Sequence, residues 1–246
     1  MAPLSKRVAV ISDVHANRHA LDAVLEAIAA AEVDELWCLG DLVGYGPLPN
    51  ECCREVAARA ELCLAGNHDL VVLGTLSIGD FAGDAAAAAR WTRSVLSKDS
   101  SDFLADLPSS ARRDGVELFH GSARDPVWEY VLTEEAAWWT LQATEAPLVL
   151  VGHSHVPLAI GLAGDELQGG LAAEGTEVDL AAGRMLLNPG SVGQPRDGDP
   201  RAAYLLLELG RAASFHRVEY PIEQTQAEMR ERDLPEPLAA RLASGV

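Results

Sequence analysis

The sequence of 246 residues contains no apolar run that approaches the ~20 consecutive residues needed to span a membrane as a helix. It also lacks the pattern of a signal peptide, because the first few residues lead directly into the strand-like segment Arg7-Val-Ala-Val-Ile. Neither a membrane nor an export route is therefore indicated. These absences predict a soluble, cytoplasmic protein.

Basic residues are scarce: the chain has 19 Lys and Arg but 37 Asp and Glu, which gives a formal net charge of −18. A surface with this charge repels polyanions, and this argues against broad binding to nucleic acid. A small phosphorylated substrate is still compatible with the sequence, because bound cations can reverse the field inside a cleft.

Cysteine is also rare. The four cysteines are Cys38, Cys52, Cys53 and Cys63, and their spacing matches no zinc-binding pattern. In a chain without an export signal, a structural disulfide is the weaker interpretation. We therefore expect reduced thiols, of which Cys38 and Cys63 lie in apolar runs and act as small hydrophobic side chains.

Short apolar runs alternate with amphipathic segments in the first third of the chain. Apolar runs without polar alternation are typical of parallel strands that are covered on both faces, and the segments between them have helical spacing. This order predicts an α/β sheet with strands at 8–12, 36–39 and 62–65 and helices at 20–31 and 51–60.

The rest of the chain predicts further helices and a second sheet. The Ala-rich segment 84–107 is expected to form a helical cap, which Pro108 ends. Beyond Pro157, short runs separated by glycine-containing turns indicate antiparallel strands of the second sheet. Strands are expected at 116–120, 148–151, 158–162, 177–180, 184–187, 203–209 and 214–220, with a helix at 133–144. The predicted fold is one α/β domain over residues 1–246, a four-layer α/β/β/α sandwich of two mixed sheets flanked by helices.

Most of the histidines follow a predicted strand and adjoin Gly, Asp or Asn. They are His15, His68, His120, His153 and His155. In α/β sheets, ligands bind in the crevice beyond the carboxyl ends of the strands. One such histidine alone is more often a turn residue or a satisfied polar group than a ligand, but five at the same end of a sheet indicate a binding site. His19 and His216 lack such neighbours and are assigned to a helix surface and a strand surface.

Carboxylates and an amide accompany these imidazoles. Asp13 and His15 are two residues apart, so both side chains would point to the same side of an extended strand end. Asp41 follows Gly40, and the missing side chain lets the backbone approach the site closely. The segment Asn67-His68-Asp69 adds an amide oxygen, an imidazole and an acid that could orient it.

These side chains indicate a metal site. The candidate ligands are Asp13, His15, Asp41, Asn67, His120, His153 and His155. Oxygen and imidazole donors without a thiolate suit Mn, Fe, Zn or Ni better than Ca or a structural Cys-type zinc. Seven donors are too many for one transition-metal ion. We therefore expect two divalent ions that share Asp41 and lie about 3.5–4 Å apart.

The motifs D-x-H, G-D-x-x-G-Y-G, G-N-H-D, H-G and G-H-S-H, in this order and spacing, resemble the calcineurin-like metallophosphoesterase superfamily. The resemblance extends from Val8 to about Asp197. Its small bacterial and archaeal phosphodiesterases are similar to this chain in size and in the segment Asn188-Pro-Gly-Ser-Val-Gly. The resemblance implies a two-sheet sandwich flanked by helices, in agreement with the strand pattern.

The resemblance also implies a role for each candidate residue. Asp13, His15 and His155 would hold the first ion, Asn67, His120 and His153 the second, and Asp41 would be shared. His68, with Asp69 beside it, would assist the leaving group. The implied activity is hydrolysis of a phosphodiester or related phosphate ester by a metal-bridging hydroxide, with Mn²⁺ as the first candidate metal.

Other functions are compatible with the same residues. A phosphoprotein phosphatase and a dinucleoside polyphosphate hydrolase would use the same site. A non-catalytic scaffold is the competing class, since some members of the superfamily resemble enzymes but serve as binding modules. All ligand positions are retained in this chain, which favours an enzyme with a small phosphorylated substrate.

Arg196 is the candidate residue for binding the substrate phosphate. Its planar guanidinium can bind two phosphate oxygens, but a loop arginine that pairs with Asp197 or Asp199 is equally compatible with the sequence. The motifs have few other cations near them. A diester, with a single negative charge, is therefore expected rather than a monoester dianion.

Overall fold

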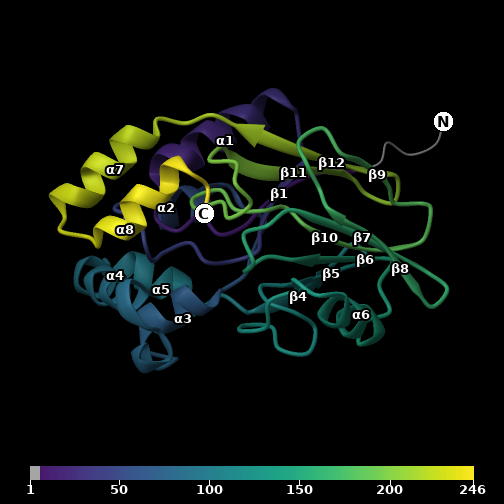
Figure 1. Cartoon of the computed structure of the whole chain (residues 1–246), viewed down its shortest axis with the longest axis horizontal. Coiled ribbons are helices and arrows are strands. Elements are labelled where there is room, and N and C mark those ends of the chain that lie inside the picture. The colour runs from purple at the N-terminus through teal and green to yellow at the C-terminus, as the bar shows by residue number, and fades with distance from the viewer. Residues whose placement is uncertain (1–5) are drawn as a thin grey trace.

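The computed structural model describes residues 6–246, which form two six-stranded sheets packed face to face with helices outside them (Figure 1). The first sheet has the order β3 (Leu62–Cys63), β2 (Glu35–Cys38), β1 (Arg7–Ile11), β11 (Ala202–Glu208), β12 (Ala212–Val218) and β9 (Glu177–Asp179). The second has the order β4 (Ser110–Arg113), β5 (Val116–Phe119), β6 (Leu148–Val151), β10 (Arg184–Asn188), β7 (Leu158–Ala163) and β8 (Glu166–Leu171). Both contain parallel and antiparallel pairs, so the predicted fold class is confirmed.

Helices cover the outer faces of the two sheets. Helices α1 (Arg18–Ala30) and α2 (Pro49–Arg59) pack on the first sheet, and α6 (Glu134–Gln142) packs on the second. The other helices are α3 (Asn67–Leu73), α4 (Gly83–Val95), α5 (Lys98–Ala105), α7 (Ile222–Glu231) and α8 (Glu236–Ala240), with the 3-10 turns η1 (Ile78–Asp80) and η2 (Arg241–Ala243). The last helices, α7 and α8, lie at the same end of the molecule as α4 (Figure 1).

The central strands are buried on both faces, as their apolar runs predict. In β1, Val8 and Val10 face the core between the sheets, whereas Ala9 and Ile11 pack in the cluster beneath α1. Trp37 of β2 is fully buried between the sheets. Two apolar faces hold these strands in place, so the residues that follow them start from fixed positions.

The prediction that the later strands all belong to the second sheet is wrong. Strands β9, β11 and β12 extend the first sheet, whereas β7 and β10 extend the second. Two edge strands, β4 and β8, were not predicted. Strand β8 is mostly exposed and contains Gly169 and Gly170, so it shows no apolar alternation, and only its hairpin with β7 defines its position.

The predicted helical region 84–107 forms α4 and α5. Helix α4 packs on the C-terminal helices, because Ala88 lies in one apolar cluster with Met229 and Leu238. Just before α4, the ring of Phe81 contacts the ring of His68, with the centroids 4.4 Å apart. The segment just before α4 therefore borders the candidate site at Phe81, and the role of region 84–107 as a substrate-covering cap stays a prediction.

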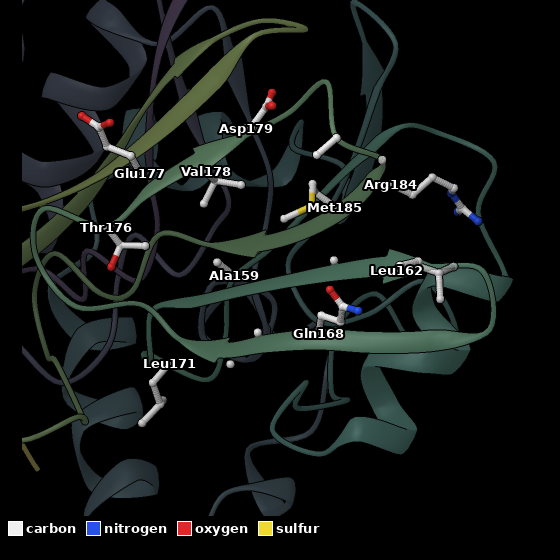
Figure 2. A pocket seen from close by; sticks show the side chains of 16 residues that line it. Ala159, Leu162, Gln168, Leu171, Thr176, Glu177, Val178, Asp179, Arg184 and Met185 are labelled. Carbon is white, nitrogen blue, oxygen red and sulfur yellow. The ribbon is translucent and has the colours of Figure 1, made fainter.

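A cavity of about 620 Å³ opens between β7, β8, β9 and β10. Figure 2 shows the side chains of Gln168, Leu171 and Met185 around it. The cavity reaches Arg184 and Met185 at the start of β10, whereas Asn188 is at the other end of that strand. No candidate metal ligand lines the cavity.

The cysteines of the described chain are all free, as predicted. None of the helices within 6–246 combines the length and apolar character that a membrane crossing needs.

Candidate metal centre

The candidate ligands meet beyond the carboxyl ends of β1, β2, β3, β5 and β6. In the first group of donors, His15 Nε2 lies 3.0 Å from His155 Nε2 and 3.6 Å from Asp41 Oδ2. Asp13 Oδ1 lies 3.4 Å from His155 Nε2. The donor atoms of these four residues all lie within 4.8 Å of one another, so that one cation could contact them all.

A second group of donors shares Asp41 with the first. His120 Nε2 lies 3.5 Å from Asp41 Oδ2 and 3.2 Å from Asn67 Oδ1, and His153 completes the group. Asn67 is the first residue of α3. The structure therefore brings the seven predicted ligands together in two groups, which divide as the resemblance implies.

The ligands reach the site through left-handed backbone turns rather than extended strand ends. The φ angles are 55° at Asp13, 47° at His15, 54° at Asp41, 63° at His153 and 61° at His155. The expectation based on strand alternation is therefore wrong, although the paired side chains do converge. A left-handed non-glycine residue costs roughly 1–2 kcal/mol, and such strain is concentrated at functional sites.

A backbone carbonyl oxygen lies against one ring nitrogen of each candidate histidine ligand. The pairs are His15 Nδ1 with Val43 O (3.2 Å), His120 Nδ1 with Leu39 O (2.9 Å), His153 Nε2 with Trp128 O (3.2 Å) and His155 Nδ1 with Gln194 O (2.6 Å). Since a carbonyl oxygen only accepts hydrogen bonds, this nitrogen carries the proton of the neutral ring. The other nitrogen keeps its lone pair and can bind a metal, as in metal-binding histidines generally.

The two candidate carboxylate ligands each have one oxygen held by the backbone and one left open. Asp13 Oδ2 accepts from His153 N at 3.2 Å, and Asp41 Oδ1 accepts from His68 N at 2.8 Å. Asp13 Oδ1 and Asp41 Oδ2 are buried without any hydrogen-bond partner among residues 6–246. Buried oxygens and imidazole lone pairs that face one another are unfavourable unless a cation lies between them. The residues present therefore fit a divalent metal.

Burial shifts the pKa values of these groups toward their neutral forms. It raises the pKa of Asp13 to about 7 and the pKa of Asp41 well above its ordinary value. It lowers the pKa of His15 and His155 well below 6.5, and the pKa of His153 to about 2. Both directions follow from the loss of solvation of a charged group. A bound cation would favour the ionised carboxylates and leave the imidazoles neutral.

His68 lies beside the candidate ligands without belonging to either group of donors. Its ring centroid is 4.8 Å from that of His15 and 4.3 Å from that of Tyr45. Its Nδ1 is buried and has no hydrogen-bond partner in the described chain. Burial lowers the pKa of His68 well below 6.5, so the ring is neutral.

The expectation that Asp69 orients the His68 ring is wrong. Its carboxylate oxygens accept hydrogen bonds from Gly66 N at 2.9 Å and Val43 N at 3.1 Å. Asp69 is the third residue of α3, and its side chain reaches back to accept from the backbone N–H of the N-cap residue Gly66. This is the half of a capping box that a glycine N-cap allows. Asp69 thus fixes the loops that carry Asp41 and His68, which is a positioning role.

Glycines make room for the ligands. A side chain at Gly40 would place its Cβ 2.7 Å from Gly66 N, and the φ of Gly40 is +102°, so the predicted close approach of the backbone is confirmed. At Gly44, which has a φ of +86°, a Cβ would lie 2.4 Å from His68 Nδ1. The spacing of the glycines in the G-D-x-x-G-Y-G motif therefore follows from the packing around Asp41 and His68.

Arg196 is half-buried at the edge of the site. Its Nη2 lies 3.4 Å from the hydroxyl of Tyr45. The alternative that it pairs with a neighbouring acid is wrong, because those acids have other partners. The ion pairs are Asp197 with Arg217 and Asp199 with Arg201.

The sequence did not indicate two further residues at this edge. Arg241, in η2, lies over the ring of Tyr45, with its Cζ 4.8 Å from the ring centroid. Tyr45 is part of the G-D-x-x-G-Y-G motif and could have been found from it. Arg241 lies in a C-terminal segment without any recognisable motif, so only the fold reveals its position.

Comparison with known proteins supports the same interpretation. Residues 7–212 match the family described as Calcineurin-like phosphoesterase superfamily domain. An uncharacterized protein of Methanocaldococcus jannaschii is 36% identical over 245 residues, which cover 97% of this chain and 98% of that protein. The crystal structure of a metallophosphoesterase from Sphaerobacter thermophilus is 44% identical and has a TM-score of 0.88, with 98% of this chain and 100% of that chain covered.

A shorter match links the chain to a protein of known activity. A symmetrical bis(5'-nucleosyl)-tetraphosphatase of Burkholderia pseudomallei is 29% identical over 143 residues. These residues cover 55% of this chain and 48% of that protein. The similarity therefore concerns about half of each protein.

We expect metal affinity to depend on pH below about 7, because Asp13 of the empty site takes up a proton there and must lose it to bind a cation. The imidazole ligands with lowered pKa values contribute no protons in this range. The affinity for Mn²⁺ should fall at least about tenfold per pH unit below about pH 7, because the pKa of Asp41 is also raised and this carboxyl group adds a second proton to be displaced. Calorimetric titrations in two buffers with different ionisation enthalpies would measure the proton release. An affinity that stays constant between about pH 6 and pH 7 would contradict this account of the site.

Proposed function

The chain belongs to the calcineurin-like phosphoesterase superfamily, and we propose that it hydrolyses a phosphodiester or related phosphate ester at a centre of two divalent metal ions. Membership of this family implies a phosphoester hydrolase that uses divalent metals. The proposal of two ions is supported by the position of Asp41, whose carboxylate belongs to both groups of donors.

The proposed ligands divide between the two ions. Asp13, His15 and His155 would hold one ion, Asn67, His120 and His153 the other, and Asp41 would contact both. Bound ions would supply positive charge for the phosphate oxygens and a water of lowered pKa as the nucleophile. Mn²⁺ is the proposed metal, because the donors are oxygens and imidazoles without a thiolate.

The remaining residues of the site would act on the phosphate and on the leaving group. Arg196 forms no ion pair with an acid among the described residues, and its charge acts on Asp13 and His155, so it is available to bind a phosphate oxygen. His68 is buried and neutral, and it would donate an N–H hydrogen bond to the departing oxygen rather than act as a cation. The sequence instead predicts that His68 acts with Asp69 as its partner. The carboxylate of Asp69 accepts hydrogen bonds from the backbone and is not available to His68.

A second candidate function is hydrolysis of a dinucleoside polyphosphate. It is supported by the similarity to the tetraphosphatase of Burkholderia pseudomallei over about half of that protein. The phosphorus atom that is attacked in such a substrate also carries two substituents, as in a diester. A non-catalytic scaffold is disfavoured, because both groups of donors are complete.

We predict that His68→Ala lowers kcat by about 10²–10⁴ on a substrate with a poor leaving group, because the departing oxygen loses a hydrogen-bond donor. The metal content should stay unchanged, since His68 belongs to neither group of donors. The matched control is His19→Ala, which removes an imidazole that contacts Glu228 on the helix surface. An unchanged kcat, or loss of metal from His68→Ala, would rule out the proposed role.

We predict that the protein loaded with Mn²⁺ hydrolyses bis-p-nitrophenyl phosphate with a higher kcat/KM than p-nitrophenyl phosphate. The diester carries one negative charge, whereas the dianion of the monoester needs more cations around the same phosphorus. Arg196→Ala should raise the KM for the diester about tenfold, because a hydrogen bond between charged groups is lost. A preference for the monoester with several metals would exclude a diesterase.

A further inference from the structure

Two arginines that are distant in the sequence meet at Tyr45. The Cζ atoms of Arg241 and Arg196 lie 4.8 Å and 5.9 Å from the centroid of the Tyr45 ring. Gln194 Oε1 accepts a hydrogen bond from the Nη2 of each arginine, at 3.3 Å from Arg196 and 2.5 Å from Arg241. One neutral oxygen and one aromatic ring therefore hold two guanidinium groups together.

The two guanidinium groups form no ion pair with an acid in the part of the chain that the structure describes. Within residues 6–246, no carboxylate forms an ion pair with Arg196 or Arg241, although the chain has 37 Asp and Glu and only 19 Lys and Arg. The Nε atom of each is buried without a hydrogen-bond partner in the same part of the chain. Burial and the charge of Arg196 both lower the pKa of Arg241. An anion between these groups would remove this unfavourable state.

Arg196 is nearer to the candidate metal centre than Arg241. The Tyr45 ring lies against His15 and His68, with centroid distances of 4.6 Å and 4.3 Å. The charge of Arg196 acts on Asp13, His15 and His155, whereas the charge of Arg241 acts on His68 at the edge of the site. A phosphate bound at the metal centre would therefore contact Arg196 first, and Arg241 would be the next cation outward.

Arg241 is supplied by a part of the chain that the family match does not include. The match ends at residue 212, and η2 begins at Arg241. The segment is well packed, because Leu242, Leu238 and Met229 form one apolar cluster with Ala88 of α4. The position of Arg241 is thus built into the fold and is not a chance surface contact.

We propose that Arg241, together with Arg196 and Gln194, forms a subsite for a second phosphate group of the substrate. The proposal rests on the proposed function, since the first phosphate would be the one hydrolysed at the metal centre. The substrate class is a phosphate chain in which the attacked phosphorus carries another phosphate as one of its two substituents. The attacked phosphorus then still carries two substituents, as in a diester, and the second phosphate group binds to Arg241.

A pair of stable phosphonates tests the subsite without requiring turnover. Methylenediphosphonate has two phosphonate groups joined by a carbon that cannot be hydrolysed, and methylphosphonate has one. Calorimetry with the full-length protein loaded with Mn²⁺ would give the ratio of their affinities. We expect the diphosphonate to bind at least about tenfold more tightly, and Arg241→Gln to reduce this ratio about 10- to 100-fold.

Control variants separate a binding role from a structural one. Arg230→Gln removes the same charge from neighbouring α7, where Arg230 is exposed and pairs with Glu236, and it should keep the wild-type ratio. Arg241→Lys keeps the charge but loses the planar fork, so its ratio should be intermediate. If Arg241→Gln unfolds, the lysine variant decides the question.

Two results would overturn the subsite. One is equal affinity of the wild-type protein for the two phosphonates. The other is a ratio that persists in both Arg241 variants, which would mean that the metal ions alone prefer the diphosphonate and that Arg241 only packs on Tyr45. Hydrolysis of bis-p-nitrophenyl phosphate by the wild-type protein tests the proposed function separately, since that diester has no second phosphate.

Discussion

Two buried carboxylates, Asp13 and Asp41, each direct one unpaired oxygen at a set of imidazole lone pairs. Within the described chain no hydrogen-bond donor contacts these two oxygens, and burial raises the pKa of both carboxylates. Such an arrangement is unfavourable in an apolar interior unless a cation occupies it. The other features of the site follow from this constraint: carbonyl groups that fix the imidazole tautomers and backbone amides that hold the second carboxylate oxygens.

The fold meets this constraint with rigid strands and strained turns. Strands β1, β2, β5 and β6 are buried on one or both faces, so the residues that follow them are placed precisely with respect to one another. The turns then take left-handed conformations at Asp13, Asp41 and His153. Asp69 adds hydrogen bonds that hold the loop carrying Asp41 to the start of α3. The stability of the packed strands offsets the local strain of the turns that carry the ligands.

The sequence predicted the fold class and the side chains that meet at the candidate metal centre, because both depend on local signals: apolar runs, and polar residues where the runs end. It could not assign β9, β11 and β12 to the first sheet, since strand partners depend on long-range packing that a run of apolar residues does not encode. The exposed edge strand β8 lacks a pattern altogether. Asp69 was misassigned because its carboxylate accepts hydrogen bonds from the backbone N–H groups of Gly66 and Val43 and does not contact the neighbouring imidazole. Arg241 was missed because its importance arises only when the C-terminal segment packs beside Tyr45.

The central claim is that Asp41 is shared by two divalent ions. Anomalous diffraction from crystals of the wild-type protein grown with Mn²⁺ tests it most directly. The account predicts two peaks about 3.5–4 Å apart, one beside His15 and His155 and one beside His120 and His153, with the Asp41 carboxylate between them. In Asp41→Asn crystals both peaks should weaken together. A single peak in the wild-type protein, or two undiminished peaks in the Asp41 variant, would contradict the claim.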